Sequence, residues 1–138
     1  MEDSDPTLMQ IGAAAERTEM SLPTLRHWEE VGLVIPSARS NGGFRLYSEA
    51  DITRIHMVKS MKPLDLTLEE IRELLELLER TDSQPATAEY GRLVKHYTER
   101  TRYCISRVHR HLAYATELLG MLEARLPASS DASGVSQR

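Results

Sequence analysis

A long, uninterrupted helical segment constrains this chain more than any other feature. Residues 86–126 contain no proline, and an apolar row recurs along them at alternating spacings of four and three. A neighbouring row repeats every seven residues, at Ile105, Leu112, Leu119 and Leu126. A helix of this length far exceeds the usual globular helix and cannot bury both rows against itself. The spacing therefore favours a coiled coil, most simply with a second copy of the chain.

The contacts between the two copies are expected along both apolar rows. They are Tyr97, Cys104, Ile105, Val108, Leu112, Ala115, Leu119 and Leu122. Cys104 is the only cysteine, which excludes an intramolecular disulfide framework. We interpret Cys104 as a small buried apolar residue. A redox role for its thiol, or a metal site formed with His111 of the second copy, is the alternative.

Two short helices are predicted near the N-terminus. Residues 10–18 are rich in alanine, the best helix former. Ser21 suits the N-cap of a second helix that begins at Leu22, and Pro23 falls in its first turn, where a missing amide hydrogen costs little. This helix is expected to end at Gly32, a favoured residue just after a helix. Two short helices around a tight turn are typical of a helix-turn-helix.

A β-hairpin is predicted to follow. The pair Asn41-Gly42 is a strong hairpin signal because both residues accept a positive φ. Arg39 and Arg45 flank this tip. A small hairpin with an arginine on either side is typical of a DNA-binding wing, and a plain surface hairpin is the alternative.

Two capping boxes mark the starts of two further helices. The first, Ser48–Asp51, begins a helix that runs to about Met61, and Pro63 marks its end. The second, Thr67–Glu70, begins an amphipathic helix with leucine and isoleucine along one side. Polar residues 81–85 form a predicted linker before the long segment.

Charge and composition narrow the possible functions. The net charge of −4 means that any DNA-binding face must be local. The chain has no apolar run long enough to cross a bilayer, and its acidic N-terminus is unlike a signal peptide, so a cytoplasmic protein is expected. No nucleophile–base pair, phosphate-binding loop or pair of catalytic carboxylates is visible, so we do not expect an enzyme.

Three motifs, in order along the chain, resemble the MerR family of bacterial transcription regulators. They are Met9–Ala15 with Ser21–Leu33, then Gly43–Ser48, and then Asp65–Ile71. The resemblance implies a mostly α fold, in which a winged helix-turn-helix with a small β-hairpin wing precedes a long dimerising helix in an antiparallel coiled coil. The DNA-binding domain would span residues 9–80 and the dimerisation helix residues 86–126, with a disordered lead at 1–8 and a disordered tail at 127–138.

The resemblance also implies a function. A homodimer would bind double-stranded promoter DNA and distort the spacer between promoter elements so that RNA polymerase engages both. The alternative is a protein-interaction module that uses the coiled coil and has lost DNA binding. The effector stays unassigned, because the cysteines of metal-sensing relatives are absent and an iron–sulfur sensor would need several. We therefore expect no metal or cofactor.

The resemblance assigns candidate DNA contacts residue by residue. They are Thr24, Arg26, His27 and Trp28 on the recognition helix, Arg39, Arg45 and Tyr47 on the wing, and Arg17 and Lys62 beside them. An arginine that donates to guanine is the commonest specific base contact, and phosphate contacts dominate affinity. A packed Trp28 and a solvated Lys62 are the alternatives. Asp65 stands where the family often has glycine, so we expect a strained or differently built junction there.

Overall fold

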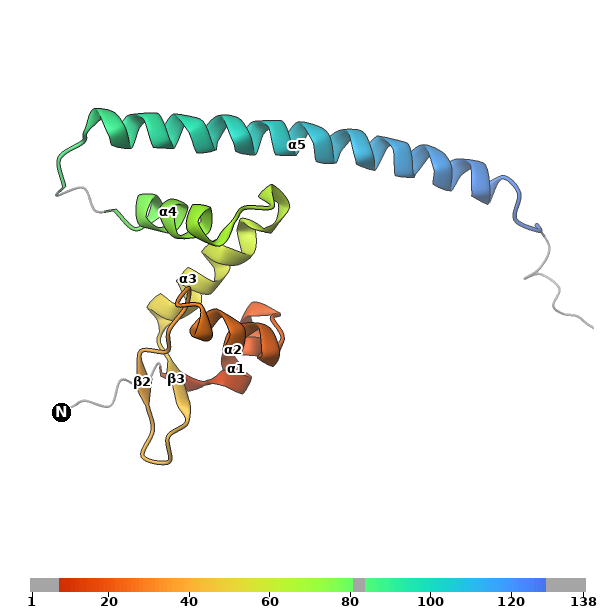
Figure 1. Cartoon of the computed structure of the whole chain (residues 1–138). Coiled ribbons are helices and arrows are strands. Elements are labelled where there is room, and N and C mark those ends of the chain that lie inside the picture. Colours follow the sequence, from red (N-terminus) through yellow and green to blue (C-terminus); the bar gives the residue numbers. More distant parts are fainter. Residues whose placement is uncertain (1–7, 81–83, 129–138) are drawn as a thin grey trace, which may run out of the picture. The chain divides into compact units, whose positions relative to one another are not determined.

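The computed structural model describes residues 8–80 and 84–128, which form two compact units, one up to Tyr97 and one from Thr98. Its elements are β1 (Met9–Gln10), α1 (Ile11–Thr18), α2 (Leu22–Glu30), β2 (Ala38–Arg39), β3 (Arg45–Tyr47), α3 (Glu49–Ser60), the 3-10 helix η1 (Lys62–Leu64), α4 (Leu68–Leu78) and α5 (Ala88–Glu123) (Figure 1). The predicted lead, linker and tail lie outside the described residues, apart from residues 8, 84–85 and 127–128.

The predicted helix-turn-helix is confirmed. Glu19 ends α1 in the left-handed region with φ 56°, and the chain then turns into α2. The Ser21 hydroxyl accepts a hydrogen bond from the amide of Thr24 at 3.2 Å, as expected of an N-cap. Gly32 follows α2 with φ 79°, a conformation that glycine adopts without the penalty of a Cβ atom.

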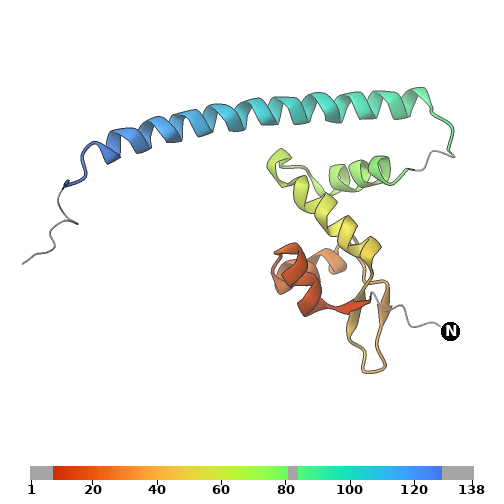
Figure 2. The same cartoon turned by 180° about the vertical axis from the view of Figure 1, so that it is seen from behind.

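The predicted hairpin forms, but its turn differs from the prediction. Asn41 and Gly42 do not have positive φ, whereas Gly43 does, with φ 82°. The Ser40 carbonyl accepts from the Gly43 amide at 2.9 Å, so the loop is a turn followed by a left-handed glycine, and not the expected two-residue Asn-Gly turn. The hairpin extends beyond the helices of its unit in both views (Figures 1 and 2).

A third, very short strand completes the sheet. The strand order is β1-β3-β2, with both pairings antiparallel, so β3 is central. Met9 pairs with Tyr47, and Arg39 pairs with Arg45 across the hairpin. The sequence did not reveal β1, because a strand of two residues has no recognisable periodicity.

The core of the first unit lies between α1, α2, α3 and the sheet, with α4 packed on α3. Its fully or nearly fully buried side chains include Ala14, Leu25, Leu33, Val34, Tyr47, Ile52, Ile55, Val58, Met61 and Leu75. Helix α3 supplies three of these at Ile52, Ile55 and Val58, a helical spacing. The aliphatic composition of this core suits the low aromatic content of the chain, 5%.

The junction between α3 and α4 is strained, not rebuilt. Asp65 has φ 53° and ψ 52°, the left-handed conformation that a glycine would adopt freely. The predicted capping box then begins α4: Thr67 and Glu70 exchange side-chain and backbone hydrogen bonds at 2.9 and 3.2 Å.

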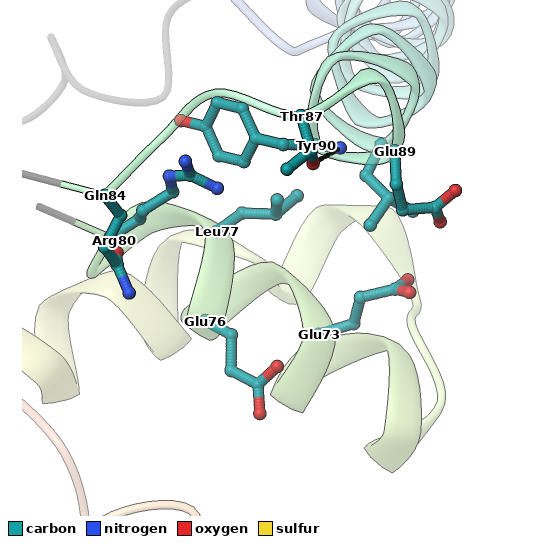
Figure 3. A pocket seen from close by; sticks show the side chains of 9 residues that line it. Glu73, Glu76, Leu77, Arg80, Gln84, Thr87, Glu89 and Tyr90 are labelled. Carbon is teal, nitrogen blue, oxygen red and sulfur yellow. Dashed lines mark hydrogen bonds between the residues drawn. The ribbon is translucent and has the colours of Figure 1, made fainter. Parts of the chain in front are cut away.

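The start of α5 packs on α4 within the first unit. The Tyr97 hydroxyl donates a hydrogen bond to Glu73 Oε1 at 2.6 Å. The Arg80 guanidinium lies over the Tyr90 ring, 4.1 Å from its centroid. Glu73, Arg80 and Tyr90 border a pocket of about 310 Å³, which Leu77 and Glu76 also line (Figure 3).

The rest of α5 exposes most of its apolar residues. The side chains of Ile105, Val108, Leu112, Leu119 and Leu122 are 48–64% exposed, and Ala115 is exposed as well. Tyr97 and Cys104, by contrast, are only 4% and 6% exposed within a single chain. The expected dimer contacts, these two residues included, stay a prediction, and exposed apolar side chains also occur earlier on the helix, at Val94 and Tyr103.

Candidate DNA-binding interface

Helix α2 presents polar side chains on its outer face. Arg26 and His27 are exposed, and the His27 ring nitrogen Nδ1 lies 3.7 Å from a carboxylate oxygen of Glu30. Thr24 is half-buried, and its hydroxyl shares a hydrogen bond of 2.7 Å with Ser21. Among the candidates on α2, Arg26 thus has the exposed guanidinium that a base or phosphate contact requires.

Trp28 faces inward. It is half-buried and packs against the hydrophobic core, and it lines a groove of about 470 Å³ with Met20 and Leu66. Its backbone carbonyl accepts from the amides of Leu33 and Val34, which close the end of the helix. This position favours the packed alternative for Trp28 over a direct DNA contact.

The two wing arginines converge on one carboxylate of α2. Glu29 Oε2 accepts from Arg39 Nη2 at 2.7 Å, and Glu29 Oε1 accepts from Arg45 Nε. The Glu29 hydrogen bond raises the pKa of Arg45 above its ordinary value, so this guanidinium stays charged. Sequence reasoning missed Glu29, because its contacts depend on how α2 docks beside the hairpin and no local pattern signals them.

Tyr47 does not lie on the wing surface. Its side chain is fully buried, and its hydroxyl oxygen has no hydrogen-bond partner in the part of the chain that the structure describes. Burial raises the pKa of this hydroxyl above its ordinary value. The expected phosphate contact from Tyr47 is therefore corrected: the residue belongs to the core at the root of the wing.

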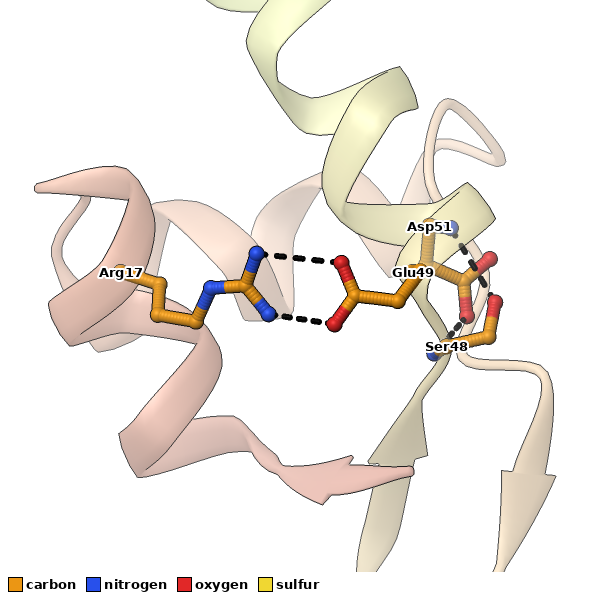
Figure 4. Close-up of polar contacts among 4 residues, drawn as sticks. All are labelled: Arg17, Ser48, Glu49 and Asp51. Atoms are coloured by element: carbon orange, nitrogen blue, oxygen red, sulfur yellow. Dashed lines mark hydrogen bonds and ion pairs between the residues drawn. The ribbon is translucent and has the colours of Figure 1, made fainter. Parts of the chain in front are cut away.

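Arg17 is tied to the start of α3. Its two terminal nitrogens donate to the two carboxylate oxygens of Glu49 at 2.5 and 3.0 Å (Figure 4). This hydrogen bonding, together with the negative charge of Glu49, raises the pKa of Arg17. Lys62 is exposed at the start of η1, as a phosphate-binding lysine would be.

Two further arginines hold the end of the recognition helix. Arg72 of α4 donates to the carbonyl of Val31, and Arg54 of α3 donates to the carbonyl of Leu33 at 2.5 Å. These carbonyls follow the last turn of α2, where backbone acceptors lack helical partners. The orientation of α2 is therefore fixed by both of the helices that follow the wing.

The part of the chain that the structure describes has neither a metal-binding cluster nor a membrane-spanning helix. The described residues contain no group of three or more histidine, cysteine, aspartate or glutamate side chains placed to hold a metal ion. No helix among residues 8–80 and 84–128 is both long and apolar enough to cross a bilayer.

Comparison with known proteins identifies the family. Residues 9–78 match the model of the MerR HTH family regulatory proteins. The chain belongs to the MerR family. One similar protein, the HTH-type transcriptional regulator ZntR homolog of Haemophilus influenzae, is 31% identical over 123 residues, which are 89% of this chain and 87% of that protein.

Another similar protein and a solved structure match this chain over different lengths. The HTH-type transcriptional regulator YyaN of Bacillus subtilis is 39% identical over 85 residues, and the aligned part is 59% of this chain and 62% of YyaN. The chain thus matches less than two thirds of YyaN. The structure of HiNmlR, a MerR family regulator lacking the sensor domain and bound to promoter DNA, superposes with a TM-score of 0.62 at 21% identity, covering 85% of this chain and 91% of that one. This likeness supports the fold.

Proposed function

We propose that the protein is a sequence-specific transcription regulator that binds promoter DNA as a homodimer and distorts the spacer DNA to control transcription by RNA polymerase. The observation that carries the proposal is the junction of α2 with the wing. There, Arg39 and Arg45 of the hairpin meet the helix that presents Arg26. A helix for the major groove and a basic hairpin beside it form the two contact elements of a winged helix-turn-helix. HiNmlR, which has the same fold, is described as bound to promoter DNA.

The exposed apolar surface of α5 supports dimerisation. Ile105, Leu112 and Leu119 follow one another at heptad spacing and are each more than half exposed in the single chain. A continuous apolar surface of this kind marks a protein contact. An identical helix supplies the matching apolar row, and a dimer would place two copies of α2 on one duplex.

The proposed DNA contacts have separate roles. Arg26 reads a base edge, and Thr24 and His27 contribute beside it. Arg39, Arg45, Arg17 and Lys62 contact phosphates, which set affinity and register but carry little sequence information. Trp28 supports the helix from inside.

A gel-shift assay on the DNA upstream of the protein's own gene tests this function. The probes should include versions with lengthened and shortened promoter spacers. Arg26→Ala is expected to relax discrimination at one base position by about 1–3 kcal/mol. Arg45→Ala is expected to weaken binding to all duplexes and to lower the slope of log affinity against log salt by about one.

Arg92→Ala is the matched control. Arg92 is an exposed arginine on α5 that pairs with Glu89, three positions before it, so its loss should leave the shift of the specific duplex (the operator) unchanged. A wild-type protein that shifts no duplex specifically would contradict the proposal. That result would favour a protein-interaction module built on the coiled coil.

A further inference from the structure

We propose that Glu29 is a positioning residue that locks the wing to the recognition helix, so that both DNA-reading elements meet the duplex as one unit. This inference rests on the proposed function. It gives a role to a side chain that is not itself a DNA ligand.

The geometry of the carboxylate supports a lock. Glu29 lies in the last turn of α2, and its side chain is 20% exposed. Each of its two oxygens accepts from a different strand of the hairpin: Oε2 from Arg39 of β2 and Oε1 from Arg45 of β3. Arg39 and Arg45 are directly paired in the hairpin register, so a single carboxylate spans both strands.

The same network reaches the tip of the wing. Arg39 Nη1 donates to the carbonyl of Gly43 at 3.2 Å. Gly43 is the left-handed residue of the turn, and its amide closes the loop on Ser40. The position of Arg39 on Glu29 therefore influences the tip as well as the strands. A half-buried network in which every oxygen has a partner holds geometry better than an isolated surface pair.

The charge of Glu29 is unfavourable for simple DNA attraction. A carboxylate on the recognition helix repels phosphates, and here it takes some of the N–H donors of the two arginines that are proposed to bind them, leaving their other donors for phosphate. Removing it should therefore have two opposite effects. General attraction to DNA should rise because a negative charge is lost, whereas specific binding should fall because two long side chains must be ordered on the duplex.

The next residue provides a matched control. Glu30 has the same charge on the same helix, but its side chain is 78% exposed, and among the described residues it accepts no hydrogen bond from Arg39 or Arg45. Glu30→Gln should raise affinity for specific and non-specific duplexes by similar factors. The ratio of the two affinities should therefore stay within about two-fold of wild type.

The experiment compares the full-length wild-type chain with Glu29→Ala, Glu29→Gln and Glu30→Gln. Dissociation constants are measured for the operator and for a scrambled duplex at several salt concentrations. Glu29→Ala is expected to lower the specific-to-non-specific ratio about ten-fold. The ratio for Glu29→Gln should lie between those of Glu29→Ala and wild type. Its amide oxygen can accept from one arginine, but its amide NH2 group is a donor and cannot accept from the other.

Hydrogen exchange of the DNA-free protein separates positioning from simple destabilisation. The amides of Ser40 and Gly43 should exchange faster in Glu29→Ala than in wild type, and at the wild-type rate in Glu30→Gln. The core amide of Ile55 should keep its wild-type rate in both variants. If the wild-type protein binds its operator specifically and Glu29→Ala keeps the same specific-to-non-specific affinity ratio, this inference is overturned while the proposed function stands. If the wild-type protein binds no duplex specifically, the proposed function fails and this inference fails with it.

Discussion

Tyr47 joins the wing to the core through a ring that is completely buried and a hydroxyl that has no partner among the described residues. A buried hydroxyl without a hydrogen bond costs free energy that a phenyl ring would not. Tyr47→Phe should therefore leave the free energy of unfolding unchanged or raise it by about 1 kcal/mol, as measured by urea denaturation. Its affinity for DNA should equal that of wild type. A large loss of affinity would place the hydroxyl on a phosphate instead.

The raised pKa of Tyr47 also predicts a pH dependence. Burial favours the neutral hydroxyl in the folded state, so the folded protein holds this proton to a higher pH than the unfolded chain does. The corresponding stability is present below about pH 10, the ordinary pKa, and is lost as the pH rises through the folded pKa. Wild type should therefore lose stability above pH 10 more steeply than Tyr47→Phe. Equal slopes for the two proteins would contradict the assignment.

Asp65 holds a left-handed conformation that its side chain disfavours. In this conformation a residue with a Cβ atom is less stable than glycine by about 1 kcal/mol. Replacement by glycine also makes the unfolded state more flexible, which offsets part of the stability gained. Asp65→Gly should raise the free energy of unfolding by up to about 1 kcal/mol, and Asp65→Ala should lower it. Thermal denaturation followed by circular dichroism measures both. If Asp65→Gly is less stable than wild type, the Asp65 carboxylate stabilises the fold by more than its left-handed conformation destabilises it.

Among the elements, the helix starts were the most predictable from sequence. Ser48 and Asp51 form their capping box because the two partners are three residues apart, and the interaction is local. The conformation of the hairpin turn was not predictable from Asn41-Gly42, because the ladder register moved the left-handed position to Gly43. The Glu29 contacts depend on how α2 docks beside the hairpin, which no local pattern encodes.

Asp51 also ties the segment before the wing to α3. Its Oδ2 accepts from the Ser37 amide at 3.0 Å, the Ser37 hydroxyl at 2.6 Å and the Ser48 amide at 2.9 Å. Asp51→Ala removes all three bonds, and we expect a loss of about 2 kcal/mol in the free energy of unfolding, measured by urea denaturation. Glu49→Ala, which breaks the exposed pair with Arg17, is the control and should cost less. Equal losses for the two variants would show that the Ser37 contacts are not stabilising.

At the scale of the whole molecule, the apolar surface of α5 implies an assembly. Heptad spacing predicted an apolar row at Ile105, Leu112 and Leu119, and these side chains are exposed in the single chain. Tyr97 and Cys104 are only 4% and 6% exposed, and Tyr97 is bonded to Glu73, so their predicted contacts with a second copy remain to be tested. Periodicity identifies an apolar face but does not say whether the same chain or a partner covers it.

A charge in this surface should separate the two copies. Leu112→Glu places a carboxylate at a position that the proposed coiled coil buries, where an unpaired charge is strongly unfavourable. Size-exclusion chromatography with light scattering should then report single chains, and operator affinity should fall at least 100-fold because two half-sites are no longer bound together. Ser106→Glu adds the same group outside the heptad rows and should remain dimeric. If Leu112→Glu is still a dimer, the dimer interface does not include Leu112.

The stoichiometry on DNA tests the central claim most directly. Analytical ultracentrifugation of the wild-type chain, titrated onto the specific duplex that the gel-shift assay identifies, gives the number of chains bound at saturation. We predict two chains per duplex, with no populated complex of one chain. Saturation at one chain per duplex, or a half-site bound as tightly as the full site, would contradict the account.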